Sequence, residues 1–298
     1  MANKYGATNS HPLFVKREVQ ILCVFVLLIS SLICTCAAKE RFVQFNRKDR
    51  LKTSQFVQAY SYSGCNGKFR DLDGQKKLRI YRMAKCVGSA YADESVPDGF
   101  RCQSSEWCRS VFCTSPILKD YRCFGSGRVV FKSGLRVRIM RDVVSGELLI
   151  AFPGVEDIND VSVVFDALLS GDDIARLNEA VEIVRVASSA REGKMVLAGH
   201  SLGGLLAAYA TISQESNYIE CYLFNPIGIP RNLFRKLDSN RIKLIKRQII
   251  TVFHPQDILR GYYSFGMSYC LDWELNVSAS KAHSINHMIS MLKALSGT

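Results

Sequence analysis

The sequence predicts an α/β fold in which a mainly parallel central sheet is flanked by helices. From residue 127 onward, apolar runs alternate with segments of helical periodicity, which is the order that a parallel sheet with covering helices requires. The runs at residues 148–152 and 195–198 are apolar throughout, as in strands buried on both faces. Directly after the second run, the pattern changes to a glycine-rich turn and then to a helix. No linker or internal repeat divides residues 39–298, so we expect them to form a single domain.

The remaining elements follow from periodicity and from turn residues. Residues 76–91 have helical spacing of their apolar side chains. We expect residues 92–124 to be loop-like because they hold prolines and a group of cysteines. Further strands are predicted at 127–132, 135–140, 218–224, 248–253 and 262–271, and further helices at 157–169, 173–190, 205–210, 230–237 and 284–295.

An uncharged apolar stretch at residues 21–38 indicates targeting to the secretory pathway. As a signal peptide, it places the small residues Cys36 and Ala38 at positions −3 and −1 of a cut before Lys39. As a signal anchor, it is at the short end of what spans a bilayer. Both interpretations of residues 1–38 remain open. Either one predicts a secreted or membrane-anchored protein with its main domain in the secretory lumen or outside the cell.

Cysteine usage also indicates an oxidising compartment. Of 11 cysteines, three lie within residues 21–38, which leaves an even number in the remainder. These are Cys65, Cys86, Cys102, Cys108, Cys113, Cys123, Cys221 and Cys270, and most of them fall in a basic, Cys-rich N-terminal part at 39–125. We assign no pairing. Because no Cys-x-x-Cys pair or Cys/His cluster occurs, we expect no metal and no cofactor. Asn276 begins a glycosylation sequon, in keeping with export.

The net charge of +12 is concentrated in the first half of the chain. A basic surface suits anionic lipid headgroups or an acidic partner, so we expect a membrane surface to be a partner. No nucleic-acid-binding motif accompanies the charge, so we do not expect nucleic acid to be a partner. The sequence does not indicate the oligomeric state.

Ser201 is the candidate nucleophile. It is the central residue of a G-x-S-x-G pattern placed between a strand and a helix, which is the setting of a nucleophile elbow. Gly199 and Gly203 stand two residues before and after it, where a side chain would collide with the turn. Because a serine hydroxyl is a poor nucleophile at neutral pH, it needs a histidine base that a carboxylate orients.

Asp257 is the candidate acid. After a nucleophile elbow, the acid and then the histidine follow in chain order. Asp257 lies in the loop after the predicted strand 248–253, at the end of a strand where open sheets present functional groups. Glu220 falls within a predicted strand and Asp238 at a helix end, so both fit this position less well.

The candidate base is His283 or His287. His254 also follows the serine, but it precedes Asp257 and would break the chain order. Ser284 is a plausible N-cap, which places His283 in the loop before the last helix and His287 one turn inside it. A loop histidine reaches the serine more easily, so we prefer His283 and keep His287 as the alternative.

The oxyanion of a tetrahedral intermediate needs two backbone N–H donors. Leu202 directly follows the nucleophile and is expected to provide the first donor. The loop at residues 151–155 follows an earlier strand, and its Gly154 permits an unusual backbone geometry. We therefore expect the N–H of Val155 to be the second donor.

Four segments together resemble the class 3, fungal-lipase-like family of α/β hydrolases: LLIAFPGVEDINDV, MVLAGHSLGGLLA, ITVFHPQDIL and the late AHSI. The helix KCVGSAY with its following cysteines is also similar, so the resemblance covers most of residues 56–298. It implies an α/β-hydrolase fold and a serine hydrolase that cleaves carboxylic esters of lipids, of the triacylglycerol lipase or phospholipase type. It also implies a triad of Ser201, Asp257 and His283, an oxyanion hole at Val155 and Leu202, and a lid over an acyl pocket at 156–171.

Two residues depart from the family pattern. Pro153 replaces the usual arginine, and Val155 replaces a threonine or serine whose hydroxyl helps to orient the oxyanion hole. The backbone donor survives, so we expect altered rather than lost activity. The alternatives are a catalytically inactive lipase-like domain that binds lipid or a protein partner, and an acyltransferase that uses the same triad.

Overall fold

The computed structural model describes residues 65–91, 95–118, 120–154, 175–190, 193–214, 218–228, 247–257, 266–271 and 277–297. All of them belong to one compact unit, Tyr60–Thr298. The targeting segment at 21–38, the predicted helices at 157–169 and 230–237, and the sequon at Asn276 lie outside the described residues. No helix among the described residues is long and apolar enough to cross a membrane.

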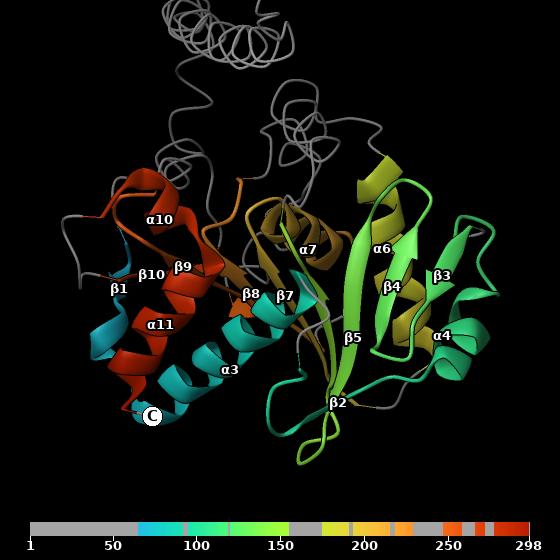
Figure 1. Cartoon of the computed structure of the whole chain (residues 1–298), viewed down its shortest axis with the longest axis horizontal. Coiled ribbons are helices and arrows are strands. Elements are labelled where there is room, and N and C mark those ends of the chain that lie inside the picture. Colours follow the sequence, from blue (N-terminus) through green and yellow to red (C-terminus); the bar gives the residue numbers. More distant parts are fainter. Residues whose placement is uncertain are drawn as a thin grey trace, which may run out of the picture. The chain divides into compact units, whose positions relative to one another are not determined.

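The described strands form one mixed sheet (Figure 1). They are β1 Gly67–Lys68, β2 Phe100–Cys102, β3 Tyr121–Cys123, β4 Arg128–Phe131, β5 Arg136–Asp142, β6 Leu148–Phe152, β7 Met195–His200, β8 Ile219–Phe224, β9 Ile249–Phe253 and β10 Met267–Cys270. Their order is β1-β10-β9-β8-β7-β6-β5-β4-β3, with β2 beside β5. All pairs from β1 to β6 are parallel, whereas the pairs on the β3 side of β6 are antiparallel. The sheet thus has the strand directions expected of an α/β-hydrolase fold with an antiparallel extension at one end.

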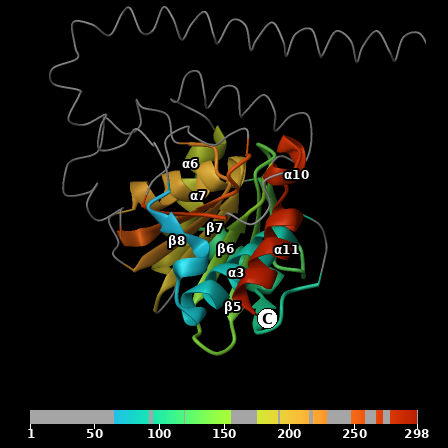
Figure 2. The same ribbon diagram turned by 90° about the vertical axis from the view of Figure 1, so that its left-hand side faces the viewer.

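Helices cover both faces of this sheet (Figures 1 and 2). They are α3 Gly74–Tyr91, α4 Ser105–Phe112, α6 Ala175–Ser189, α7 Leu202–Ser213, α10 Ala279–His283 and α11 Ile285–Ser296. One face buries its side chains against α3 and α11, which also pack on each other, and the opposite face buries its side chains against α4, α6 and α7. The predicted α/β class, with helices on both faces, is therefore confirmed.

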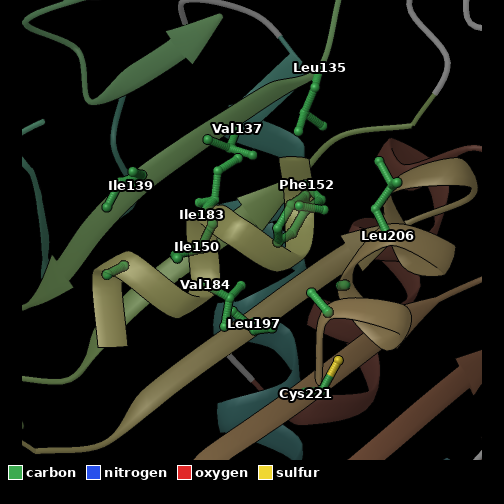
Figure 3. Packing of buried hydrophobic residues seen from close by; sticks show 14 of the residues in the cluster. Leu135, Val137, Ile139, Ile150, Phe152, Ile183, Val184, Leu197, Leu206 and Cys221 are labelled. Carbon is green, nitrogen blue, oxygen red and sulfur yellow. The ribbon is translucent and has the colours of Figure 1, made fainter. Parts of the chain in front are cut away.

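The strand β6 shows why the central strands are apolar throughout. Leu148, Ile150 and Phe152 point into the cluster shared with α6 and α7, where Figure 3 shows Ile150 and Phe152 among the packed side chains. Leu149 and Ala151 point the other way, into the cluster with α3 and α11. Since successive strand residues face opposite sides, a strand covered on both faces needs apolar residues at every position. Each large buried side chain contributes roughly 1.5–3 kcal/mol.

Residues 92–124 differ from the loop that their composition predicts. They contain β2 and β3, which extend the sheet at its antiparallel end, and the helix α4 between them. Ser104 caps α4, since its hydroxyl accepts a hydrogen bond from the backbone N–H of Trp107 at 3.1 Å. The three-residue strands are too short to show a period, and β2 exists only through its pairing with β5, about 40 residues further along the chain.

The parallel strands end in register at one edge of the sheet. Phe152 of β6 pairs with Gly199 of β7, and Phe224 of β8 pairs with both His200 of β7 and Val252 of β9. The loops that follow these strands are therefore brought to the same edge. Functional groups of open α/β sheets gather there, outside the carboxyl ends of the strands.

A disulfide joins Cys65 to Cys270 across 205 residues of sequence and fixes the short strand β1 beside β10. The other cysteines of the Cys-rich N-terminal part are not paired: Cys86, Cys102, Cys108, Cys113 and Cys123 are free thiols, as is Cys221. Cys86, Cys108 and Cys221 are buried in the two apolar clusters, where a thiol packs as a small hydrophobic side chain.

Removing this disulfide is expected to destabilise the fold. The double variant Cys65→Ser/Cys270→Ser loses a cross-link that closes a long loop of the unfolded chain, so its free energy of unfolding should fall by about 2–4 kcal/mol. Urea unfolding monitored by circular dichroism measures this change. The matched control is Cys113→Ser, because that thiol is free and exposed. Equal unfolding midpoints for the double variant and the control would contradict the prediction.

Candidate active site

Ser201 lies at the sharp turn between β7 and α7. Its backbone has φ 54° and ψ −122°, a region that residues with a side chain rarely adopt and that costs of the order of 1–3 kcal/mol. Surrounding backbone groups hold the turn. The carbonyl of Ser201 accepts hydrogen bonds from the N–H groups of Gly204 and Ile227, each at 3.0 Å, and its own N–H donates to the carbonyl of Phe224 at 3.2 Å. The strained geometry of a nucleophile elbow is thus present.

The glycines around the serine are required by space. A Cβ atom added to Gly199 would lie 2.1 Å from the carbonyl oxygen of Gly203, and one added to Gly203 would lie 2.1 Å from that of Phe152. A Cβ atom on Gly204 would lie 2.6 Å from a carbon of Pro226. The strand β7, the helix α7 and the loop after β6 therefore meet backbone to backbone, as the pattern around Ser201 predicts.

Ser201, His283 and Asp257 form a continuous hydrogen-bonded chain. The Oγ atom of Ser201 lies 2.9 Å from Nε2 of His283, and Nδ1 of His283 lies 2.9 Å from Oδ2 of Asp257. The carboxylate only accepts, so Nδ1 carries the proton and Nε2 is the acceptor for the serine hydroxyl. The side chain of Asp257 is completely buried. This arrangement has the direction that a serine, a base and an orienting acid require.

His283 occupies a different local structure from the predicted loop. It is the last residue of the short helix α10, which begins after Ser278, whose hydroxyl accepts a hydrogen bond from the N–H of Lys281. Ser284 stands at the N-cap position of α11 as predicted, although its side chain makes no capping hydrogen bond. His287 lies on the first turn of α11 with its ring centroid 5.6 Å from that of His254. The hydrogen bonds to both Ser201 and Asp257 are made by His283.

Asn225 connects the loops that carry the acid and the base. It follows β8 with a left-handed φ of 41°. Its Oδ1 accepts from the backbone N–H of His254 at 2.8 Å, and its Nδ2 donates to the carbonyl of Ala282 at 2.8 Å. His254 lies three residues before Asp257, and Ala282 directly precedes His283. Sequence analysis missed Asn225, and its position directly after a parallel strand is the only signal that points to it.

The predicted oxyanion donors are only partly within the described residues. Leu202 is the first residue of α7, so its N–H has no partner within the helix and points out of the helix N-terminus. Val155 and the predicted lid at 156–171 lie outside the described residues. Gly154 is needed here for space and not for an unusual φ, since its Cβ atom would lie 2.9 Å from Cβ of Ser201.

His200, the residue before the serine, is a buried polar group that sequence analysis did not single out. Its Nδ1 lies 2.5 Å from the hydroxyl of Tyr91, and its Nε2 lies 2.6 Å from the carbonyl oxygen of His283. Burial lowers the pKa of His200 from 6.5 to about 3, with a further contribution from the neighbouring His283. The ring is therefore neutral at every physiological pH.

A small hollow adjoins the serine turn, and no metal site is present among the residues that the structure describes. The hollow combines leucine side chains with two guanidinium groups. It is lined by Gly134, Leu135, Arg136, Pro153, Gly154, Arg176, Leu202 and Leu206.

The sheet order, the strained serine turn and the Ser–His–Asp chain at the carboxyl edge define the class as an α/β-hydrolase fold with a hydrolase-like site. No protein-family model and no curated protein matches the chain.

Among solved structures, the chain is similar to fungal lipases. With the lipase of Rhizomucor miehei in its native propeptide complex it shares 14% identity over 67% of this chain and 69% of that chain, at a TM-score of 0.41. With a triacylglycerol lipase from Penicillium expansum it shares 14% sequence identity over 66% of this chain and 80% of that chain, at a TM-score of 0.41. With the Lip2 lipase of Yarrowia lipolytica it shares 13% sequence identity over 74% of this chain and 91% of that chain, at a TM-score of 0.41. These similarities concern the course of the chain and say nothing about its substrate.

The buried neutral His200 makes stability depend on pH. Between pH 6.5 and about 3 the unfolded chain holds a proton on residue 200 that the folded chain does not bind. The free energy of unfolding should therefore fall as the pH drops below 6.5, by at most ~1.4 kcal/mol per pH unit from this group. In His200→Phe this contribution is absent, so the slope between pH 6.5 and 4.5 should be smaller than in the wild type. Urea unfolding across this range measures both slopes, and identical slopes would refute the prediction.

Proposed function

We propose that this protein is a serine hydrolase that cleaves carboxylic esters of lipids through an acyl-enzyme on Ser201. One observation carries the proposal. Ser201 lies at a strained turn, its hydroxyl is hydrogen-bonded to His283, and His283 is hydrogen-bonded to the buried carboxylate of Asp257. A serine in this setting is activated as a nucleophile, whereas a serine in an ordinary glycine-rich turn has no base within reach.

The reaction follows from the direction of the hydrogen bonds. Ser201 Oγ attacks the ester carbonyl while its proton passes to Nε2 of His283, and Asp257 stabilises the imidazolium that forms. The N–H of Leu202 donates to the oxyanion, together with the N–H of Val155. His283 then protonates the leaving alcohol. Water, deprotonated by the same imidazole, attacks the acyl-enzyme and releases the acid, which regenerates Ser201.

Support for a lipid ester as the substrate comes from the sequence. The segments around the serine, the acid and the histidine resemble the fungal-lipase-like family, and the hollow beside the serine turn is partly lined by leucines. Replacement of a threonine or serine by Val155 removes a hydroxyl and leaves the backbone donor. The protein therefore still catalyses ester hydrolysis in this proposal, but with a different catalytic efficiency.

We also propose that the protein works in an oxidising compartment and at a membrane surface. The disulfide between Cys65 and Cys270 supports the compartment, because such bonds persist in the secretory lumen and outside cells. The apolar stretch at 21–38 supports entry into that pathway, either as a cleaved signal or as an anchor. The basic excess of the first half supports contact with anionic lipid headgroups.

The triad is tested with a fluorophosphonate probe and a water-soluble short-chain ester. Ser201→Ala should lose all labelling, and His283→Ala should lower kcat/KM by roughly 10⁴-fold or more because the serine loses its base. His287→Ala is the matched control, since His287 lies on the next helix and its ring contacts that of His254 at a tilt, with the centroids 5.6 Å apart. Folded wild-type protein without Ser201-dependent labelling supports the inactive lipid- or protein-binding domain instead. Loss of labelling in His287→Ala but not in His283→Ala would reassign the base.

The substrate class is tested by product analysis. Wild-type protein is incubated with a triacylglycerol emulsion or with vesicles that contain an anionic phospholipid, each with and without an acceptor alcohol. We expect free fatty acid as the product in every case, and none with Ser201→Ala. An ester of the acceptor alcohol as the main product would instead indicate an acyltransferase that uses the same acyl-enzyme.

A further inference from the structure

A second chain of hydrogen bonds, separate from the one through Asp257, adjoins the candidate active site. Tyr91 is the last residue of α3, and its hydroxyl lies 2.5 Å from the backbone N of Gly154 and 2.5 Å from Nδ1 of His200. On the other side of the ring, Nε2 of His200 lies 2.6 Å from the backbone oxygen of His283. Residues from four separate parts of the sequence thus meet in one continuous series.

Each hydrogen bond in this series has only one possible direction. The N–H of Gly154 can only donate, so the Tyr91 oxygen accepts from it. At the other end, the carbonyl oxygen of His283 can only accept, so the proton of the neutral His200 ring sits on Nε2. Nδ1 of His200 is then the unprotonated nitrogen and accepts the hydroxyl proton of Tyr91. The His200 ring is buried, with 4% of its surface exposed, so water cannot readily replace these partners.

The series connects the parts of the site that must keep fixed distances. A Cβ atom on Gly154 would lie 2.3 Å from the Tyr91 hydroxyl and 2.9 Å from Cβ of Ser201, so this backbone is held between the two. Gly154 directly precedes Val155, the proposed second oxyanion donor. At the other end, the ring centroids of His200 and His283 are 4.9 Å apart. The Tyr91 hydroxyl is thus linked both to the backbone of Gly154 and, through His200, to the backbone of the base.

The helix α3, which carries Tyr91, is packed tightly into the fold. The last turns of α3 are buried, and the helix packs on α11 and on the strands β6 and β7. Gly88, one turn before Tyr91, lies so close to α11 that an added Cβ atom would be 2.7 Å from Ile289. Sites held by packed helices and strands keep their geometry better than sites held by loops alone.

We propose that Tyr91 and His200 are positioning residues: their hydrogen-bond chain holds the backbone at Gly154 and the base His283 in place relative to Ser201. This inference rests on the proposed ester hydrolysis. Neither residue touches the reacting atoms. Because the chain sets the geometry of the oxyanion and of the base, its loss should act on the chemical step and leave ground-state binding of the substrate nearly unchanged.

The first test is Tyr91→Phe, which keeps the ring and removes the hydroxyl. With a water-soluble short-chain ester, kcat should fall by roughly 10- to 100-fold with KM within about twofold of wild type. The rate of phosphonylation of Ser201 by the fluorophosphonate probe should fall by the same factor. Tyr121→Phe is the matched control, because Tyr121 lies on β3 and its hydroxyl donates an exposed hydrogen bond to the carbonyl of Arg109 in helix α4. An unchanged kcat in folded Tyr91→Phe would overturn the inference.

The second test is a rescue at position 200. His200→Phe removes both hydrogen bonds of the ring, whereas His200→Gln offers an amide oxygen to Tyr91 and an amide N–H to the carbonyl of His283. We expect the kcat of His200→Gln to be at least several-fold higher than the kcat of His200→Phe. Equal kcat values in the two variants, both well folded by circular dichroism, would show that the ring only fills space.

A measurement on the resting protein separates this inference from the proposed function. The downfield imidazole proton of His283, assigned by its loss in His283→Ala, should shift or broaden in Tyr91→Phe and His200→Phe and stay unchanged in Tyr121→Phe. An unmoved resonance in the first two variants overturns the positioning role, even when wild-type protein hydrolyses the ester. Absence of Ser201-dependent labelling in the wild type overturns the proposed function, and the resonance then decides the positioning role by itself.

Discussion

The close approach of three backbone segments around Ser201 is the constraint on which the site depends. The strand β7, the helix α7 and the loop after β6 touch without intervening side chains at Gly199 and Gly203, and Gly154 packs directly against the Tyr91 hydroxyl and Cβ of Ser201. This contact holds Ser201 at a backbone geometry that costs free energy in isolation. It also places the first N–H of α7 next to the loop that precedes Val155. A methyl group at any of these glycines would push apart the elements that define both the nucleophile and the oxyanion hole.

The parallel register of β6 to β9 then determines which groups meet. Each strand delivers a functional segment to the same edge: Gly154 after β6, Ser201 after β7, Asn225 after β8 and Asp257 after β9. The histidine comes from α10, beyond the sheet, and is therefore the one member of the triad whose place the strands do not set. Asn225 and the buried imidazole of His200 contact the backbone on either side of that histidine, which explains why two polar groups are retained in an apolar interior.

Much of the fold was predictable because its central strands are continuous apolar runs and its covering helices are long segments of helical periodicity. The nucleophile and the acid were predictable too, since a strand-to-helix turn and a loop after a strand are local patterns. The segment at 92–124 was wrongly assigned to loop, because three-residue strands exist only through pairing with β4 and β5. The cysteine count did not predict which sulfurs are bridged: an even count does not distinguish a bridged sulfur from one that packs in the core, and Cys86 and Cys108 do the latter.

By itself, the sequence determined the α/β class, the strained serine turn and a short set of residues for the acid and the base. These are properties of neighbouring residues, where the backbone conformation follows from glycine placement and apolar periodicity. Only the tertiary structure decided that His283 contacts both Ser201 and Asp257, and that Tyr91, His200 and Asn225 support the site. Those contacts join residues far apart in the chain, and they arise from the register of the sheet and the burial of polar groups that must find partners.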